Sequence, residues 1–270
     1  MKNYKQTFLN TFSSKKTQIS YLQGINNMEE YVQKDIHDIK RIDLVEWKNT
    51  LKHYSTATQA LYIKAIKSYF KFLEEVEILS NNPASKLSAP RVVNKPKDAL
   101  DRETALKMLN VAKNPRDKAI IALYLSTGIR VQELIDIRYQ DYMSDPQHLT
   151  LKVKGGKYRK LSLNQQCQDY INNYLKVRKT GVENLFVGNK GNKMRADCIS
   201  SMLKRMARKV GYEGEVSNHT LRSTFITDVA MNHGVVMAQI MVNHSNINTT
   251  RKYIRGIEDH AQEIMSEMTL

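Results

Sequence analysis

Two arginines, two histidines and one tyrosine in the second half of the chain have the side-chain types needed to act on a phosphodiester. They are Arg130, His219, Arg222, His244 and Tyr253. A guanidinium is always charged and its planar fork can bond two phosphate oxygens, so the arginines are expected to clamp the non-bridging oxygens. The tyrosine hydroxyl, with an ordinary pKa of about 10, needs neighbouring cations or a base before it can attack phosphorus. The set therefore predicts a tyrosine nucleophile that works without a metal ion.

The two histidines can exchange protons near neutral pH, because imidazole has an ordinary pKa near 6.5. On a helix beginning near Asn218, His219 and Arg222 would share a face close to the N-terminus. Free backbone N–H groups and the positive end of the helix dipole would strengthen the attraction for a phosphate there. We expect His219 to act as base for Tyr253 or to orient the phosphate, and His244 to hydrogen-bond the phosphate as it becomes pentavalent.

A lysine-rich hairpin offers a proton donor for the departing 5′ oxygen. Residues 149–153 and 158–163 alternate like strands around a turn that contains Gly155 and Gly156. The lysines near this turn are Lys152, Lys154, Lys157 and Lys160. From the residues alone, a lysine here could protonate the leaving oxygen, or the hairpin could be a surface that faces DNA.

These residues, in this order and spacing, resemble the tyrosine recombinases of the phage-integrase family. The matching stretches are Ser126-Thr-Gly-Ile-Arg-Val-Gln-Glu-Leu134, His219-Thr-Leu-Arg222 and Asn246-Ile-Asn-Thr-Thr-Arg-Lys-Tyr253. Because the family has a lysine in a Gly-Lys-Gly-like turn, the resemblance implies that Lys154 is the proton donor. It also implies that Glu133 orients Arg130, and that Lys157 and Arg159 contact the DNA backbone.

The resemblance further implies site-specific recombination on double-stranded DNA. Tyr253 would form a 3′-phosphotyrosyl link and leave a free 5′ hydroxyl, and the 5′ hydroxyl of the partner strand would reverse the step. Strand exchange would pass through a Holliday junction on a homotetramer bound to paired core sites. No cofactor is expected, because the covalent ester keeps the energy of the broken bond.

Apolar residues recur at helical spacing beyond Tyr253. They are Ile257, Ala261, Ile264, Met265 and Met268. By themselves they fit a helix packed on its own domain. The resemblance favours a terminal helix that docks on a neighbouring protomer and couples the active sites of a tetramer.

Two positions depart from the pattern of the family. Ser223 follows Arg222 where the family usually has histidine, and Asn243 precedes His244 where it usually has glycine. Asparagine adopts the left-handed conformation less freely than glycine, so the second change could alter the turn before His244. Neither change removes a catalytic group.

The pattern of apolar residues predicts a mainly α fold with a small β-sheet. Helical periodicity over residues 15–33, 42–53 and 58–76 indicates a helical core-site DNA-binding domain in residues 1–92. The apolar stripe of the third helix comprises Leu61, Ala65, Ile66, Tyr69, Phe70 and Leu73. Its interleaved lysines, Lys64, Lys67 and Lys71, would form a solvated face, and we expect some of them to meet phosphates.

A proline-rich, basic stretch separates this bundle from the rest of the chain. Proline disfavours helix, and three of the five prolines stand at 83, 90 and 96, so residues 93–98 are expected to be a linker. Residues 99–270 would then form a mixed α+β catalytic domain that ends in the interaction helix. Its predicted helices span 102–112, 116–126, 131–137, 164–179, 197–210, 220–232 and 235–242.

The composition fits a nucleic-acid partner and argues against membrane-spanning, secreted and metal-binding proteins. The formal net charge is +15 and both parts of the chain are basic. The longest apolar run, residues 119–125, is far shorter than the roughly 20 residues of a membrane span, and the first residues lack a hydrophobic signal core. Cys167 and Cys198 form no close motif, which suits the cytoplasm, and no closely spaced histidine pair suggests a metal.

Two rival functions remain open from the sequence. A type IB topoisomerase uses similar chemistry without paired core sites, and an accessory DNA-binding protein could have lost the chemistry altogether. The short region before the catalytic part leaves no room for the arm-binding domain of many phage integrases, so simple recombination sites are expected. The departures at Ser223 and Asn243 favour the recombinase of a mobile genetic element.

Overall fold

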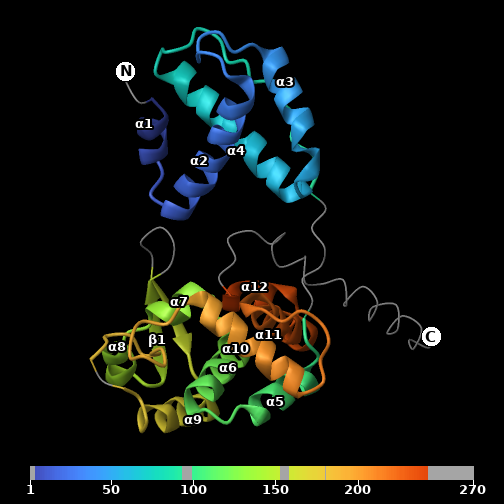
Figure 1. Cartoon of the computed structure of the whole chain (residues 1–270). Helices are drawn as coiled ribbons and strands as arrows, with labels where there is room; N and C mark the ends of the chain where they lie inside the picture. The colour runs from blue at the N-terminus through green and yellow to red at the C-terminus, as the bar shows by residue number, and fades with distance from the viewer. Residues whose placement is uncertain (1–3, 93–98, 153–157, 180, 243–270) are drawn as a thin grey trace, which may run out of the picture. The chain divides into compact units, whose positions relative to one another are not determined.

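The computed structural model describes residues 4–92, 99–152, 158–179 and 181–242 (Figure 1). The chain divides into two compact units, residues 1–94 and 95–270. The predicted linker, residues 93–98, lies outside the described residues. Within the described residues the fold is mostly helical with one two-stranded sheet, which confirms the predicted fold class.

The N-terminal unit is a small helical bundle. Its elements are α1 (Tyr4–Asn10), α2 (Lys15–Val32), α3 (Arg41–Thr50), the 3-10 turn η1 (Leu51–His53) and α4 (Thr56–Glu75). Helices α2 and α4 are capped by Ser14 and Ser55, whose hydroxyls accept bonds from Thr17 N and Thr58 N. Trp47 is fully buried in the bundle, and its indole N–H donates to Asn27.

The apolar stripe of α4 is confirmed except at its first member. Ala65, Ile66, Tyr69, Phe70 and Leu73 are all buried. Leu61 is 37% exposed instead, and Ile63 takes a place in the core. Close packing of α2 on α4 occurs at Gly24, where an added Cβ would lie 3.2 Å from the Cα of Tyr62.

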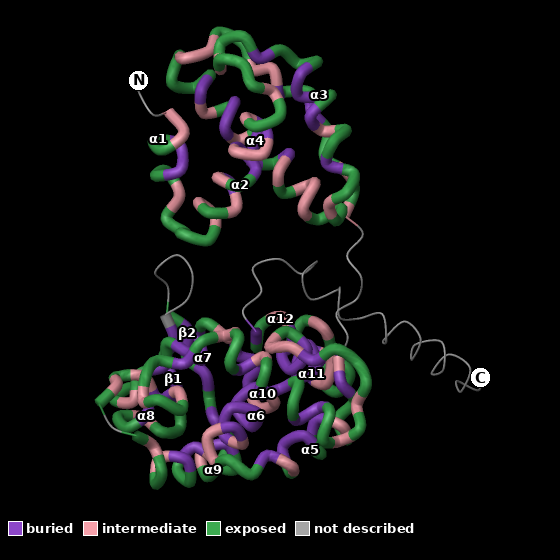
Figure 2. The backbone as a smooth tube through the Cα atoms, viewed as in Figure 1, coloured by how far each residue is buried: buried purple, intermediate pink, exposed green. Residues whose placement is uncertain are grey.

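The C-terminal unit surrounds helix α6 with other helices. Its elements are α5 (Arg102–Val111), α6 (Pro115–Thr127), α7 (Val131–Asp136), α8 (Tyr139–Ser144), β1 (His148–Lys152), β2 (Tyr158–Ser162), α9 (Gln165–Leu175), α10 (Ala196–Lys209), α11 (Asn218–His233) and α12 (Val235–Val242). Every residue of α6 from Ala119 to Tyr124 is buried, so this helix is the centre of the core (Figure 2). Helices α5, α9 and α11 pack against it.

The two strands pair antiparallel, with Leu149 opposite Leu161 and Leu151 opposite Arg159. Helices α1 and α8 were not predicted, because seven and six residues are too few to show a helical period; the equally short α7 was expected from its place directly after Arg130. The other predicted helices and strands are present, most within one to three residues of the expected bounds. No helix among the described residues is both long and apolar enough to cross a bilayer.

Candidate active site

The turn after α6 fixes the segment that carries Arg130. Helix α6 ends at Gly128, which has φ +57 and donates its N–H to the carbonyl of Tyr124. A side chain at this position would run into the ring of Phe225 on α11. Both the left-handed backbone and the close ring therefore require glycine, and together they set the position of Arg130, the residue directly before α7.

Arg130 and Glu133 form a close pair at the start of α7. The Glu133 carboxylate accepts one bond from the backbone N–H of Arg130 at 3.0 Å and one from its Nη1 at 2.7 Å. The Glu133 side chain is only 8% exposed, whereas that of Arg130 is 41% exposed. The carboxylate thus anchors an arginine whose charged end still reaches solvent, in the position that a brace for Arg130 would occupy.

Arg222 lies inside the unit and joins three elements. One terminal nitrogen donates to the carbonyl of Gly128, and the other donates to the carbonyl of Val242 at 3.2 Å. The side chain is therefore held between the Gly128 turn and the end of α12. Because Gly128 is two residues before Arg130, the two predicted arginines come from segments that are directly bonded to each other.

His219 occupies the first turn of α11 and is exposed, whereas Arg222, one turn later, is buried. Ser217 caps the helix by accepting bonds from the N–H groups of His219 and Thr220. Asn218 joins this helix start to α6 and α10, since it accepts from the hydroxyl of Tyr124 at 3.2 Å and donates to Ser200 at 2.8 Å. The start of α11 is thus fixed on two sides.

Tyr124 belongs to this scaffold and not to the chemistry. Burial raises its pKa well above the ordinary value of 10, and the charge of Arg222 opposes that shift only in part. Its hydroxyl therefore stays protonated and donates to Asn218. No local pattern could predict this contact, because 94 residues separate the two partners.

Arg159 lies inside the unit, and the expectation that it contacts the DNA backbone needs correction. Strand β2 alternates exposed and buried residues, so Tyr158 and Lys160 face outward while Arg159 is only 8% exposed. Its Nη2 donates to the carbonyl of Met241, and its Nη1 lies 3.9 Å from Glu133. The same alternation, counted back from the buried Leu161, could have revealed this orientation from the sequence.

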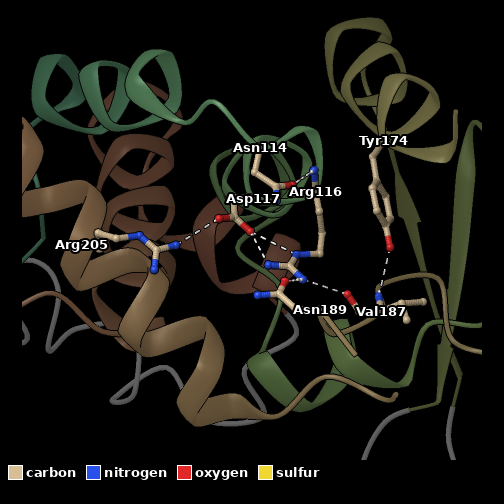
Figure 3. Close-up of polar contacts among 7 residues, drawn as sticks. All are labelled: Asn114, Arg116, Asp117, Tyr174, Val187, Asn189 and Arg205. Atoms are coloured by element: carbon tan, nitrogen blue, oxygen red, sulfur yellow. Dashed lines mark hydrogen bonds and ion pairs between the residues drawn. The ribbon is translucent and has the colours of Figure 1, made fainter. Parts of the chain in front are cut away.

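An ion-pair network centred on the buried Asp117 ties α10 and the segment after α9 to the start of α6 (Figure 3). Asp117 pairs with Arg116 at 2.8 Å and with Arg205 of α10 at 3.4 Å. Arg116 also donates to the carbonyl of Val187 at 3.0 Å and to Asn189 at 2.8 Å. Helix α10 is therefore fixed to the same helix whose other end forms the Gly128 turn.

Helix α10 presents a basic surface that the sequence reasoning missed. A shallow hollow on it is lined by Ser201, Lys204, Arg205, Arg208 and Lys209. Residues three and four apart lie on one face of a helix, so the spacing of residues 201, 204, 205 and 208 was the available signal. The opposite face, which includes Met202, Leu203 and Met206, is buried.

The predicted lysines of the N-terminal unit lie on the surface of α4. Lys64, Lys67 and Lys71 are all exposed. Lys67 donates to the carbonyl of Leu87 at 3.0 Å, and Lys71 pairs with Glu75 at 3.4 Å.

Several predicted residues lie outside the described residues, as does Asn243. They are Lys154, Lys157, His244, Tyr253, Ile257, Ala261, Ile264, Met265 and Met268. Within the described ranges, no three His, Cys, Asp or Glu side chains gather where they could hold a metal ion.

Family profiles match both units of the chain. The profile of the phage integrase family covers residues 98–260, and that of the phage integrase N-terminal SAM-like domain covers residues 2–76. This chain belongs to the phage integrase family. The predicted activity, that of a tyrosine-type site-specific DNA recombinase, is thereby confirmed, and the comparisons give no support to a topoisomerase or an inactive accessory protein.

Individual relatives agree with this assignment. The chain is 32% identical over 223 residues to tyrosine recombinase XerA of Pyrococcus horikoshii, covering 80% of this chain and 75% of the relative. It is 29% identical over 259 residues to tyrosine recombinase XerD of Oceanobacillus iheyensis, covering 90% and 86%. Among solved structures, a lambda integrase dimer bound to a COC′ core site has a TM-score of 0.76 at 16% identity, covering 93% of this chain and 74% of that one. At that identity the likeness shows the fold alone.

Proposed function

We propose that Tyr253 is the nucleophile of this recombinase and that Arg130 and Arg222 hold the scissile phosphate of DNA. The observation that carries this proposal is the bond from Arg222 to the carbonyl of Gly128, two residues before Arg130. That bond ties two cations, far apart in sequence, to one turn. A pentavalent phosphate carries extra negative charge on its non-bridging oxygens, and fixed cations stabilise it without reorganising.

The remaining residues complete an atom-balanced transfer. The Tyr253 oxygen attacks phosphorus and its proton passes to His219, while the bond from phosphorus to the 5′ oxygen breaks. Lys154 gives that oxygen a proton, and His244 donates a hydrogen bond to the phosphate. The product is a 3′-phosphotyrosyl ester. In the reverse step the 5′ hydroxyl of the partner strand attacks this ester, and a Holliday junction results once one pair of strands has been exchanged.

Basic residues in both units would hold the DNA duplex. We assign residues 1–92 to core-site binding, through the exposed lysines Lys64, Lys67 and Lys71 of α4, and residues 99–270 to catalysis. Lys157 of the hairpin and the basic face of α10 add contacts from the catalytic unit. Contacts of this kind go mostly to phosphates, so they position the protein more than they specify sequence.

Covalent trapping tests the chemistry directly. The DNA would be a nicked duplex that carries the inverted repeats flanking the gene, so that the cleaved fragment diffuses away and the ester accumulates. We expect the wild-type protein to form a denaturation-resistant DNA adduct, and Tyr253→Phe to form none. Tyr212→Phe is the matched control and should form the adduct normally. An adduct of undiminished yield with Tyr253→Phe would refute the assignment.

An apolar groove on the catalytic unit supports the proposal that the C-terminal segment of one copy docks on another. The groove has a volume of about 280 Å³ and lies among α5, α6, α9 and α11. Its apolar lining includes Leu106, Leu109, Leu125, Phe225 and Met231. Leu106 and Met231 are 43% and 42% exposed, so the groove presents apolar surface that a partner's apolar side chains would cover.

The occupant that we propose is the segment with Ile257, Ile264, Met265 and Met268 from a second copy, within a homotetramer on paired core sites. Its apolar residues recur at helical spacing, so they would form one stripe that matches an apolar groove. The Leu106→Asp variant should still bind DNA that carries a single site. It should form fewer tetramers on two-site DNA, measured by sedimentation. Met143→Asp, at another exposed apolar residue, is the control. Normal tetramers with Leu106→Asp would contradict this docking site.

A further inference from the structure

A second buried arginine, Arg159 of β2, contacts both halves of the candidate site. Its Nη2 donates to the carbonyl of Met241 on α12. Its Nη1 lies 3.9 Å from Oε2 of Glu133, the same carboxylate that holds Arg130. One guanidinium therefore bridges the element that anchors Arg130 and the last turn of α12.

The end of α12 receives two cations. Arg159 donates to the carbonyl of Met241, and Arg222 donates to the next carbonyl, that of Val242. The last carbonyls of a helix have no intrahelical partner and lie at the negative end of its dipole, so guanidinium groups stabilise them well. His244 follows Val242 by two residues. The two arginines thus fix the point from which the chain continues to His244 and Tyr253.

Burying the charge of Arg159 costs folding free energy, so its presence here implies a purpose other than stability. Nη1 of Arg159 is buried and has no hydrogen-bond partner among the described residues. Desolvation lowers the pKa of Arg159, and the nearby charge of Glu133 opposes that shift. An apolar side chain of similar length would fill the same space without desolvating a charge.

Charge balance suggests that purpose. Glu133 pairs with Arg130 at 2.7 Å, so these two groups alone have no net charge toward an incoming phosphate. With Arg159 also close to the carboxylate, the three groups carry a net charge of one positive unit. The carboxylate can then anchor Arg130 without cancelling its attraction for phosphate oxygens.

We propose that Arg159 is a positioning residue for DNA cleavage, which holds the end of α12 before His244 and offsets the charge of Glu133 beside Arg130. The inference rests on the proposed function, because it acts through residues assigned there. It replaces the surface contact with DNA that the sequence suggested for Arg159.

The test compares Arg159→Met and Arg159→Lys in the full chain on the nicked duplex described above. Two quantities are measured for each: the single-turnover rate of covalent adduct formation at saturating protein, and the Kd for the same DNA. A shift of about 1 Å in a group that supports the chemistry can cost roughly 100-fold in rate. We therefore expect Arg159→Met to lose about 100-fold in rate with its Kd nearly unchanged, and Arg159→Lys, which keeps the charge but not the fork, to lose about tenfold.

Arg178→Met is the matched control, because Arg178 also bonds backbone carbonyls, those of Val182, Asn184 and Leu185, but touches none of the assigned residues. Its cleavage rate should stay within about threefold of wild type at a temperature where it is folded, given that distant sites act independently. Adding Glu133→Gln to Arg159→Met should restore part of the lost rate, because the uncompensated carboxylate is removed.

Two results would overturn the inference. One is a wild-type cleavage rate in Arg159→Met or, if that variant does not fold, in Arg159→Lys. The other is a parallel loss of DNA binding and cleavage, which would make Arg159 a folding residue only. Failure of the proposed function is a different result, because then the wild-type protein itself would form no adduct through Tyr253.

Discussion

Replacing Gly128 with alanine should damage stability and chemistry together. Gly128 has φ +57, a conformation that costs a residue with a Cβ about 1–2 kcal/mol. The added methyl would also overlap the Phe225 ring, whose Cγ and Cε1 lie 3.0 and 3.1 Å from the Cβ position. Overpacking of this kind costs about 1–3 kcal/mol. The expected total is about 2–5 kcal/mol, compared with roughly 5–15 kcal/mol for a whole domain.

Two measurements follow from this estimate. For a unit of this size, the melting temperature should fall by roughly 4–20 °C, measured by calorimetry on the full chain. Adduct formation should fall as well, at a temperature where the variant is still folded, because the Gly128 carbonyl accepts the bond from Arg222 and Arg130 follows two residues later. The substitution therefore acts on both arginines through one turn.

Gly181→Ala is the matched control. Gly181 also has a positive φ, +95, but nothing lies within 4 Å of its Cβ position. It should show the backbone cost without the packing cost and leave cleavage unchanged. Equal destabilisation by the two substitutions would refute the packing argument, and normal cleavage by folded Gly128→Ala would refute the link to the arginines.

Three further predictions concern DNA affinity, thiol reactivity and acid stability. The double variant Lys204→Ala, Arg208→Ala should bind DNA more weakly and reduce the slope of log Kd against log salt by about 2, measured by fluorescence anisotropy; an unchanged slope would exclude both from phosphate contact. Burial raises the pKa of Cys167 to about 12, so iodoacetamide at pH 8 should label only the other, exposed cysteine, as peptide mass spectrometry would show. The hydrogen bond from Lys34 lowers the pKa of Asp43 below 3.8, so its ionised form stabilises the fold above about pH 4 and this stability is lost on further acidification. The Asp43→Asn variant should therefore show a smaller fall in melting temperature as the pH drops below about 4. The same fall as in the wild type would count against a role for the ion pair.

The helices were predictable because their signals are local. Apolar spacing, capping serines and the glycine after α6 act over a few residues, and they located every long helix within the described residues. The short helices α1 and α8 lacked enough residues to show a period. Leu61 was misplaced because a period gives the direction of a stripe but not which end of it meets another helix.

The sequence by itself determined the family and predicted the chemical set, because residue types and their order along the chain carry both. The tertiary structure alone decided which residues meet: Arg222 bonds a turn 94 residues away, and Arg159 bonds a helix end 82 residues away. No local pattern encodes such contacts, since they depend on how α6, α11 and β2 pack around a shared core. The alternation of β2 could have placed Arg159 inside the unit, but only the tertiary structure shows that it links Glu133 to the end of α12.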